Sequence, residues 1–136
     1  MKKIIFLFLF VSSAHANDSN SLQGLVVGHY DLIGKSIGNN ETYFGEVIIN
    51  GTDSGSEMQV TRVINDSTVL GKATIELTNE KVHVLRIRFV ENELSYEETC
   101  LINSDLDNYA RLTCHVYEPD KTTKKPGLEA LFIKQN

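Results

Sequence analysis

Apolar and polar residues alternate with a period of two along most of this chain. The pattern is clearest in residues 85–90, where Ile87 and Phe89 alternate with Arg86 and Arg88. Because successive side chains of a β-strand point to opposite faces of a sheet, this alternation predicts strands with one apolar face. We find no long window with the apolar spacing of three and four residues that an amphipathic helix requires.

Residues that favour turns interrupt the alternation at regular intervals. Gly, Asn and Asp gather at these points, and each point separates two segments of strand length. The eight strands predicted in this way cover about residues 24–35, 41–50, 56–65, 67–77, 81–90, 94–103, 109–118 and 127–134.

Eight strands joined by short connections favour an antiparallel up-and-down meander. Such a meander exposes two edge strands unless it closes on itself or splits into two packed sheets. We therefore predict an all-β fold with a single closed barrel, and a two-sheet sandwich is the alternative. The side chains expected to face the interior are Tyr30, Val60, Ile75, Ile87, Phe89, Leu112 and Val116.

The first sixteen residues have the three-part layout of a secretory signal peptide. Lys2 and Lys3 precede the apolar run 4–11, and Ala14-His-Ala16 supplies the small residues that a signal peptidase reads. We expect cleavage before Asn17 and a periplasmic or secreted protein. The apolar run is too short to span a bilayer and no later stretch is apolar enough, so we expect no membrane span.

The rest of the chain is long enough for one ordinary domain. We expect residues 17–23 to form a flexible lead and residues 24–136 to form the barrel domain. Loss of Lys2 and Lys3 with the leader changes the formal charge from −5 to −7. An acidic surface repels phosphate backbones, so we expect no nucleic-acid partner, whereas a basic secreted protein is electrostatically suited.

The two cysteines, Cys100 and Cys114, flank the predicted turn at residues 103–108. If Ile102 pairs with Leu112 across that turn, the two cysteines lie directly opposite each other on one face, which is a position that a cross-strand disulfide tolerates. A disulfide also suits an oxidising compartment. A metal site made by both cysteines and His115 lacks the usual ligand spacing, so we expect no metal.

Two charged residues fall on the apolar phase of their predicted strands. Arg62 is in phase with Val60, and Glu98 is in phase with Tyr96. A charge on a buried face is costly unless it is paired. One interpretation is a buried Arg62–Glu98 ion pair, or a bulge that resets the phase of a strand. The other is a ligand site inside the barrel, formed by Arg62 with Tyr30, Tyr96 and Glu98.

Gly28-His-Tyr30 at the start of the first long strand, followed by Tyr43-x-Gly45, resembles the beginning of a calycin barrel, the superfamily of lipocalins and avidins. In that family a Gly-x-Trp motif begins the first strand and its Trp plugs the barrel floor. This chain has no Trp, so Tyr30 stands at that position. The resemblance implies a small apolar molecule bound in the lumen.

A second resemblance is to the small periplasmic lysozyme inhibitors, which are also secreted disulfide-bearing barrels. Their inhibitory loop carries a Ser-Gly pair, and Ser54-Gly55 lies in a long predicted loop here. The basic and aromatic residues that follow in that family are replaced by Ser56 and Glu57. The resemblance implies a protein-binding loop that includes Asp53, Ser54, Gly55 and Glu57.

No nucleophile motif or phosphate-binding loop is found in the sequence, so we expect neither catalysis nor a cofactor. We predict a secreted binding protein that holds a small apolar or amphipathic ligand in its barrel. The alternative is an inhibitor or immunity-type protein directed at a cationic secreted hydrolase such as a lysozyme. A cavity inside the barrel favours the ligand, and a barrel filled with side chains favours the protein partner.

Overall fold

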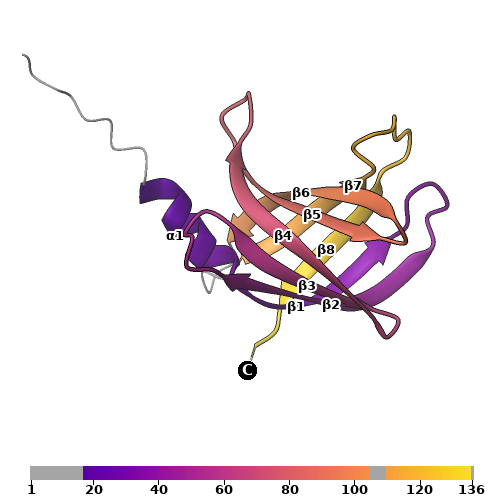
Figure 1. Cartoon of the computed structure of the whole chain (residues 1–136), viewed down its shortest axis with the longest axis horizontal. Helices are drawn as coiled ribbons and strands as arrows, with labels where there is room; N and C mark the ends of the chain where they lie inside the picture. Colours follow the sequence, from indigo (N-terminus) through magenta and orange to yellow (C-terminus); the bar gives the residue numbers. More distant parts are fainter. Residues whose placement is uncertain (1–16, 105–109, 136) are drawn as a thin grey trace, which may run out of the picture.

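The eight predicted strands are present and close into one antiparallel barrel in a computed structural model of the chain, which describes residues 17–104 and 110–135 (Figure 1). Each strand pairs with the next along the chain, and β1 pairs with β8 to close the barrel. This confirms the predicted meander and the barrel rather than the sandwich. The strands are β1 (Gly28–Lys35), β2 (Thr42–Gly51), β3 (Met58–Ile64), β4 (Ser67–Leu77), β5 (His83–Glu91), β6 (Leu94–Ser104), β7 (Ala110–Tyr117) and β8 (Gly127–Ile133).

The sequence prediction is wrong at the start of the barrel, because a helix precedes the first strand. Helix α1 covers Asn17–Val26, which includes the expected flexible lead and the first residues of the expected first strand. Its apolar residues Leu22, Leu25 and Val26 have helical spacing, and Val26 is fully buried. The segment is too short for this pattern to stand out in the sequence. The predicted signal peptide lies outside the described residues.

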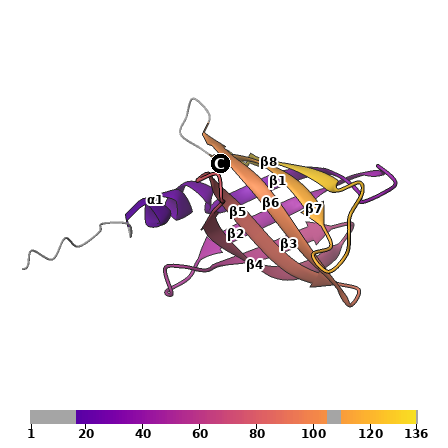
Figure 2. The same ribbon diagram turned by 90° about the horizontal axis from the view of Figure 1, so that it is seen from above.

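The connections alternate between the two ends of the barrel, as a meander requires. Helix α1 extends from one end, which we call the helix end, and the β7–β8 connection lies at the other, which we call the open end (Figure 2). At the open end, β3 and β4 are joined by Asn65-Asp66 and β5 and β6 by Asn92-Glu93. All four of these residues have positive φ, between 49° and 66°. Two-residue hairpin turns of this kind match the twist of the strands they join.

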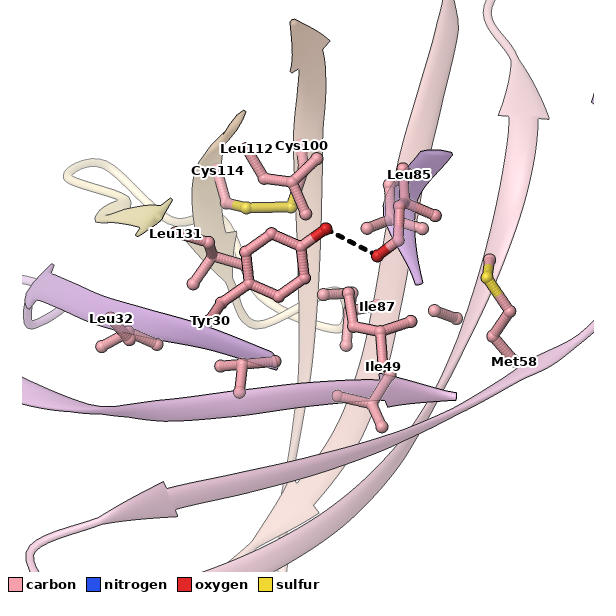
Figure 3. Close-up of a cluster of buried hydrophobic side chains, with 14 of the residues drawn as sticks. Tyr30, Leu32, Ile49, Met58, Leu85, Ile87, Cys100, Leu112, Cys114 and Leu131 are labelled. Atoms are coloured by element: carbon pink, nitrogen blue, oxygen red, sulfur yellow. Dashed lines mark hydrogen bonds between the residues drawn. A yellow bond between two sulfur atoms is a disulfide. The ribbon is translucent and has the colours of Figure 1, made fainter. Parts of the chain in front are cut away.

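Apolar side chains fill the helix end of the barrel (Figure 3). The Cys100–Cys114 disulfide joins directly opposed residues of β6 and β7, which confirms the predicted pairing. Tyr30 is fully buried among these side chains and donates a hydrogen bond of 2.7 Å to the carbonyl oxygen of Val26. Burial raises the pKa of Tyr30 to about 12, so its hydroxyl stays a neutral donor that ties the end of α1 to the barrel.

The predicted inward side chains do face the barrel interior. Six of the seven are buried and Ile75 is partly buried against the same core. Among the described residues, no helix has both the length and the apolar character needed to cross a membrane.

Candidate functional site

A cavity of about 520 Å³ occupies the open end of the barrel. Side chains from the ends of all strands except β4 contribute to its lining. Its wall is partly apolar, and the apolar residues that form it are Ile37, Ile64, Phe89, Tyr96 and Val116. The barrel is therefore packed at the helix end and hollow at the open end.

A buried cluster of charged residues lies between the packed half and the cavity. Arg62 donates from Nη1 to Oε2 of Glu129 at 2.9 Å and from Nη2 to Oε1 of Glu129 at 2.7 Å. Nη1 of Arg62 also donates to Oε1 of Glu98. The three residues are nearly inaccessible to water, at 4% exposed for Arg62, 0% for Glu98 and 2% for Glu129. The predicted Arg62–Glu98 ion pair is confirmed, and Glu129 is a second carboxylate partner.

Tyr43 belongs to the same cluster because of a glycine. Gly34 of β1 lies between Tyr43 of β2 and Glu129 of β8 in the strand register. A Cβ atom on Gly34 would lie 2.3 Å from the Tyr43 ring, so only glycine lets that ring cross β1. The Tyr43 hydroxyl consequently reaches Glu129 and donates a hydrogen bond of 2.5 Å to its Oε1.

Aromatic rings cover the guanidinium from the side of β5 and β6. The Phe89 ring centroid lies 4.3 Å from Cζ of Arg62, in cation–π geometry. Phe89 in turn stacks on Tyr96, with 5.3 Å between the ring centroids. The charged floor of the cavity and its aromatic wall are thus in direct contact.

Burial and neighbouring charges shift the protonation of the cluster. Burial would lower the pKa of Arg62, but Glu98 and Glu129 raise it above its ordinary value, so Arg62 stays charged. Burial raises the pKa of Glu98 well above 4.5, the Glu129 charge raises it further, and Arg62 only partly opposes this. Oε2 of Glu98 has no hydrogen-bond partner in the described part of the chain. Glu98 therefore keeps its proton to a higher pH than an exposed glutamate does.

Glu98 also lies near the two disulfide sulfur atoms, with one ligand atom from each residue within 4.8 Å of the others. Both sulfur atoms belong to the disulfide and cannot act as thiolate ligands. This grouping is therefore unsuited to a metal ion.

The residues predicted for a ligand site separate into two places. Arg62 and Tyr96 line the cavity, and Glu98 lies beneath its floor, bonded to Arg62. Tyr30 lies instead in the packed half and is not part of the cavity lining. Glu129 was missed because both faces of β8 carry apolar residues, so its sequence gives no clear phase.

The predicted protein-binding loop, residues 52–57, lies at the helix end, opposite the cavity mouth. Asp53, Ser54 and Gly55 are exposed. Thr52 Oγ1 donates to the carbonyl oxygen of Glu57 at 2.5 Å, and Glu57 pairs with Lys72 at 3.0 Å. The loop is thus held by its own hydrogen bonds and by one contact with β4, and the structure does not bring it together with the cavity residues.

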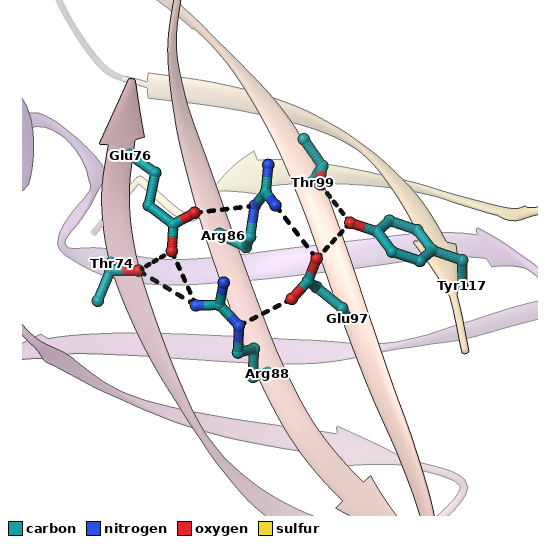
Figure 4. Close-up of polar contacts among 7 residues, drawn as sticks. All are labelled: Thr74, Glu76, Arg86, Arg88, Glu97, Thr99 and Tyr117. Carbon is teal, nitrogen blue, oxygen red and sulfur yellow. Dashed lines mark hydrogen bonds and ion pairs between the residues drawn. The ribbon is translucent and has the colours of Figure 1, made fainter. Parts of the chain in front are cut away.

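A second polar cluster lies on the outer face of β4, β5, β6 and β7 (Figure 4). Arg88 bridges Glu76 at 2.9 Å and Glu97 at 2.8 Å, and Tyr117 donates to Glu97. The Arg88 side chain is 47% exposed. Because its charges are paired and partly hydrated, we interpret this cluster as a surface ion-pair network.

No protein-family model matches the chain, and no curated protein matches it. The function is therefore argued from the cavity and its residues.

The first prediction compares the buried and the surface arginine. Arg62→Met leaves two buried carboxyl groups without their cation and should lower the free energy of unfolding by about 3–5 kcal/mol. Arg88→Met removes the same charge at an exposed site and should cost less than about 1 kcal/mol. Urea denaturation of both variants measures the difference. Adding Glu98→Leu and Glu129→Leu to Arg62→Met should recover most of the loss, and equal costs for the two arginine variants would contradict the account.

The second prediction concerns the pH dependence of stability. The raised pKa of Glu98 means that its carboxyl group stays protonated in the fold at pH values where it is ionised in the unfolded chain. The contribution of Glu98 to the free energy of unfolding therefore falls as pH rises above 4.5. Relative to the parent protein, Glu98→Gln should become more stable by up to about 1.4 kcal/mol for each pH unit in this range. Denaturation curves between about pH 5 and pH 8 test this. The exposed Glu80→Gln is the control, and parallel curves for parent and Glu98→Gln would refute the assignment.

Proposed function

We propose that the chain is a non-catalytic binding protein that holds a small amphipathic molecule in the cavity at the open end of the barrel. The observation that carries this proposal is the cavity itself, whose volume of about 520 Å³ lies within the range of small-molecule sites. Such sites combine an apolar wall with a few polar groups that fix the orientation of the ligand.

The lining of this cavity has both components. The stacked Phe89–Tyr96 pair offers an apolar surface, and Arg62 and Glu129 offer polar atoms at the floor. Arg62 is held by two carboxylates and Glu129 by Arg62 and Tyr43, so neither group needs to reorganise when a ligand arrives. Preorganised groups reduce the entropic cost of binding.

The resemblance to calycins fits this proposal. An eight-stranded meander with Tyr30 buried in the filled end has the arrangement that the family uses to bind a small molecule in its lumen. Because the open end of the barrel holds a cavity and is not filled by side chains, it favours a small ligand over a protein partner. We expect this function in the periplasm or outside the cell, after removal of residues 1–16.

The third prediction tests the cavity with N-phenyl-1-naphthylamine, an uncharged amphipathic fluorescent probe. Its fluorescence should rise on binding to the parent protein. Val116 lines the cavity, so Val116→Phe should fill part of it and weaken binding about tenfold, a loss of about 1.4 kcal/mol. Val90 is 60% exposed on the outer face of β5, so Val90→Phe is the matched control and should bind as the parent does.

Fluorescence titration measures the three affinities, and far-ultraviolet circular dichroism verifies that each variant is folded. Absence of binding by the parent, or equal binding by a folded Val116→Phe variant, would reject the cavity as the site. Inhibition of a lysozyme by the parent together with absent probe binding would favour the alternative function.

A further inference from the structure

Three glutamates stand around the mouth of the cavity. Glu41 precedes β2, Glu91 ends β5 and Glu118 follows β7, and all three belong to the cavity lining. The cations among the described lining residues are Lys35 and Arg62, and Arg62 belongs to the buried cluster. The mouth therefore carries a net negative charge.

These carboxylates are largely free to receive a cation. Glu41 and Glu91 form no ion pair with any described residue, and Glu118 pairs only with Lys121, at 3.1 Å and with the lysine side chain 62% exposed. Exposed pairs of this kind are weak and exchange readily with other charges. Burial raises the pKa of Tyr96, Glu118 and Glu91 raise it further, and Lys121 opposes them, so the charges of both glutamates act on the Tyr96 hydroxyl.

Carboxyl groups engage most of the Arg62 donors at the floor of the cavity, so little of its charge is available to an anion. Both terminal nitrogens of Arg62 already donate to Glu98 and Glu129. Phe89 covers the guanidinium on one side. An anionic group would thus meet an arginine already paired with carboxyl groups and an acidic mouth, whereas a cation would meet the carboxylates of the mouth.

We propose that the cavity selects amphipathic amines, with the apolar part against Phe89 and Tyr96 and the protonated nitrogen between Glu91 and Glu118. This inference rests on the proposed function and names the chemical class of its ligand.

The fourth prediction is tested by displacement of N-phenyl-1-naphthylamine with three compounds of equal chain length: octylammonium, 1-octanol and octanoate. We expect octylammonium to displace the probe at about tenfold lower concentration than 1-octanol, and octanoate to be the weakest. Added salt should weaken the binding of octylammonium and leave the binding of 1-octanol unchanged. If 1-octanol or octanoate displaced the probe as well as octylammonium does, the proposed selectivity for amines would be wrong. The cavity would still be a binding site.

Two glutamate variants test whether a carboxylate at the cavity mouth gives the preference for a cation. Glu91→Gln should weaken the binding of octylammonium about threefold, as expected for loss of one partly exposed ion pair. The affinity for 1-octanol should not change. Glu80 is exposed in the β4–β5 turn at the helix end, so Glu80→Gln gives the same change in net charge away from the cavity and should have no effect. Equal weakening by both variants would show a general charge effect and overturn the proposed contact.

If the parent protein does not bind the probe, titration calorimetry with octylammonium alone decides the outcome. Binding that is lost in Val116→Phe would support the amine site independently of the probe. Absence of binding would reject both the amine selectivity and the cavity.

Discussion

The contact of Arg62 with Glu98 and Glu129 is the constraint on which the arrangement of this barrel depends. It brings a fixed positive charge and two carboxyl groups to the middle of an eight-stranded barrel, where water is excluded. Below it the interior is filled by apolar side chains, and above it lies the cavity. The cluster thus divides one barrel into a packed half that stabilises the fold and a hollow half.

Such a cluster does not by itself strengthen the fold. The cost of removing its charges from water is offset only when every group has its partner, and apolar residues of similar size often serve stability equally well. Here one cation faces two carboxyl groups, and burial together with the charge of Glu129 raises the pKa of Glu98. The cluster therefore supplies a fixed polar floor to the cavity, whatever its net effect on stability.

The sequence predicts most of the fold, because the period-two alternation and the turn residues agree along nearly the whole chain. It also identifies Arg62 and Glu98, since each is a charged residue at a position where the alternation predicts an apolar side chain. It does not identify Glu129, because the neighbours of Glu129 on β8 are apolar on both faces. Tyr43 is found only once the register places Gly34 between it and Glu129, and register depends on contacts distant in sequence.

The helix shows a different limit of sequence analysis. Helix α1 has only ten residues, and its apolar face is completed by the barrel end against which Val26 packs. Tertiary contacts of this kind override weak local patterns. The sequence suggests a site inside the barrel but not the position or volume of the cavity, because the strand pattern shows which side chains face inward and not how much space they fill.

The most direct test of the central claim is nuclear magnetic resonance of the Arg62 guanidinium in the parent protein at neutral pH. Because two carboxylates hold its terminal nitrogens in a buried site, its Nη protons should give separate signals that exchange slowly with water. The Arg88 guanidinium, which is partly exposed, serves as the reference in the same spectrum. A single averaged Arg62 signal that exchanges as fast as that of Arg88 would contradict the account.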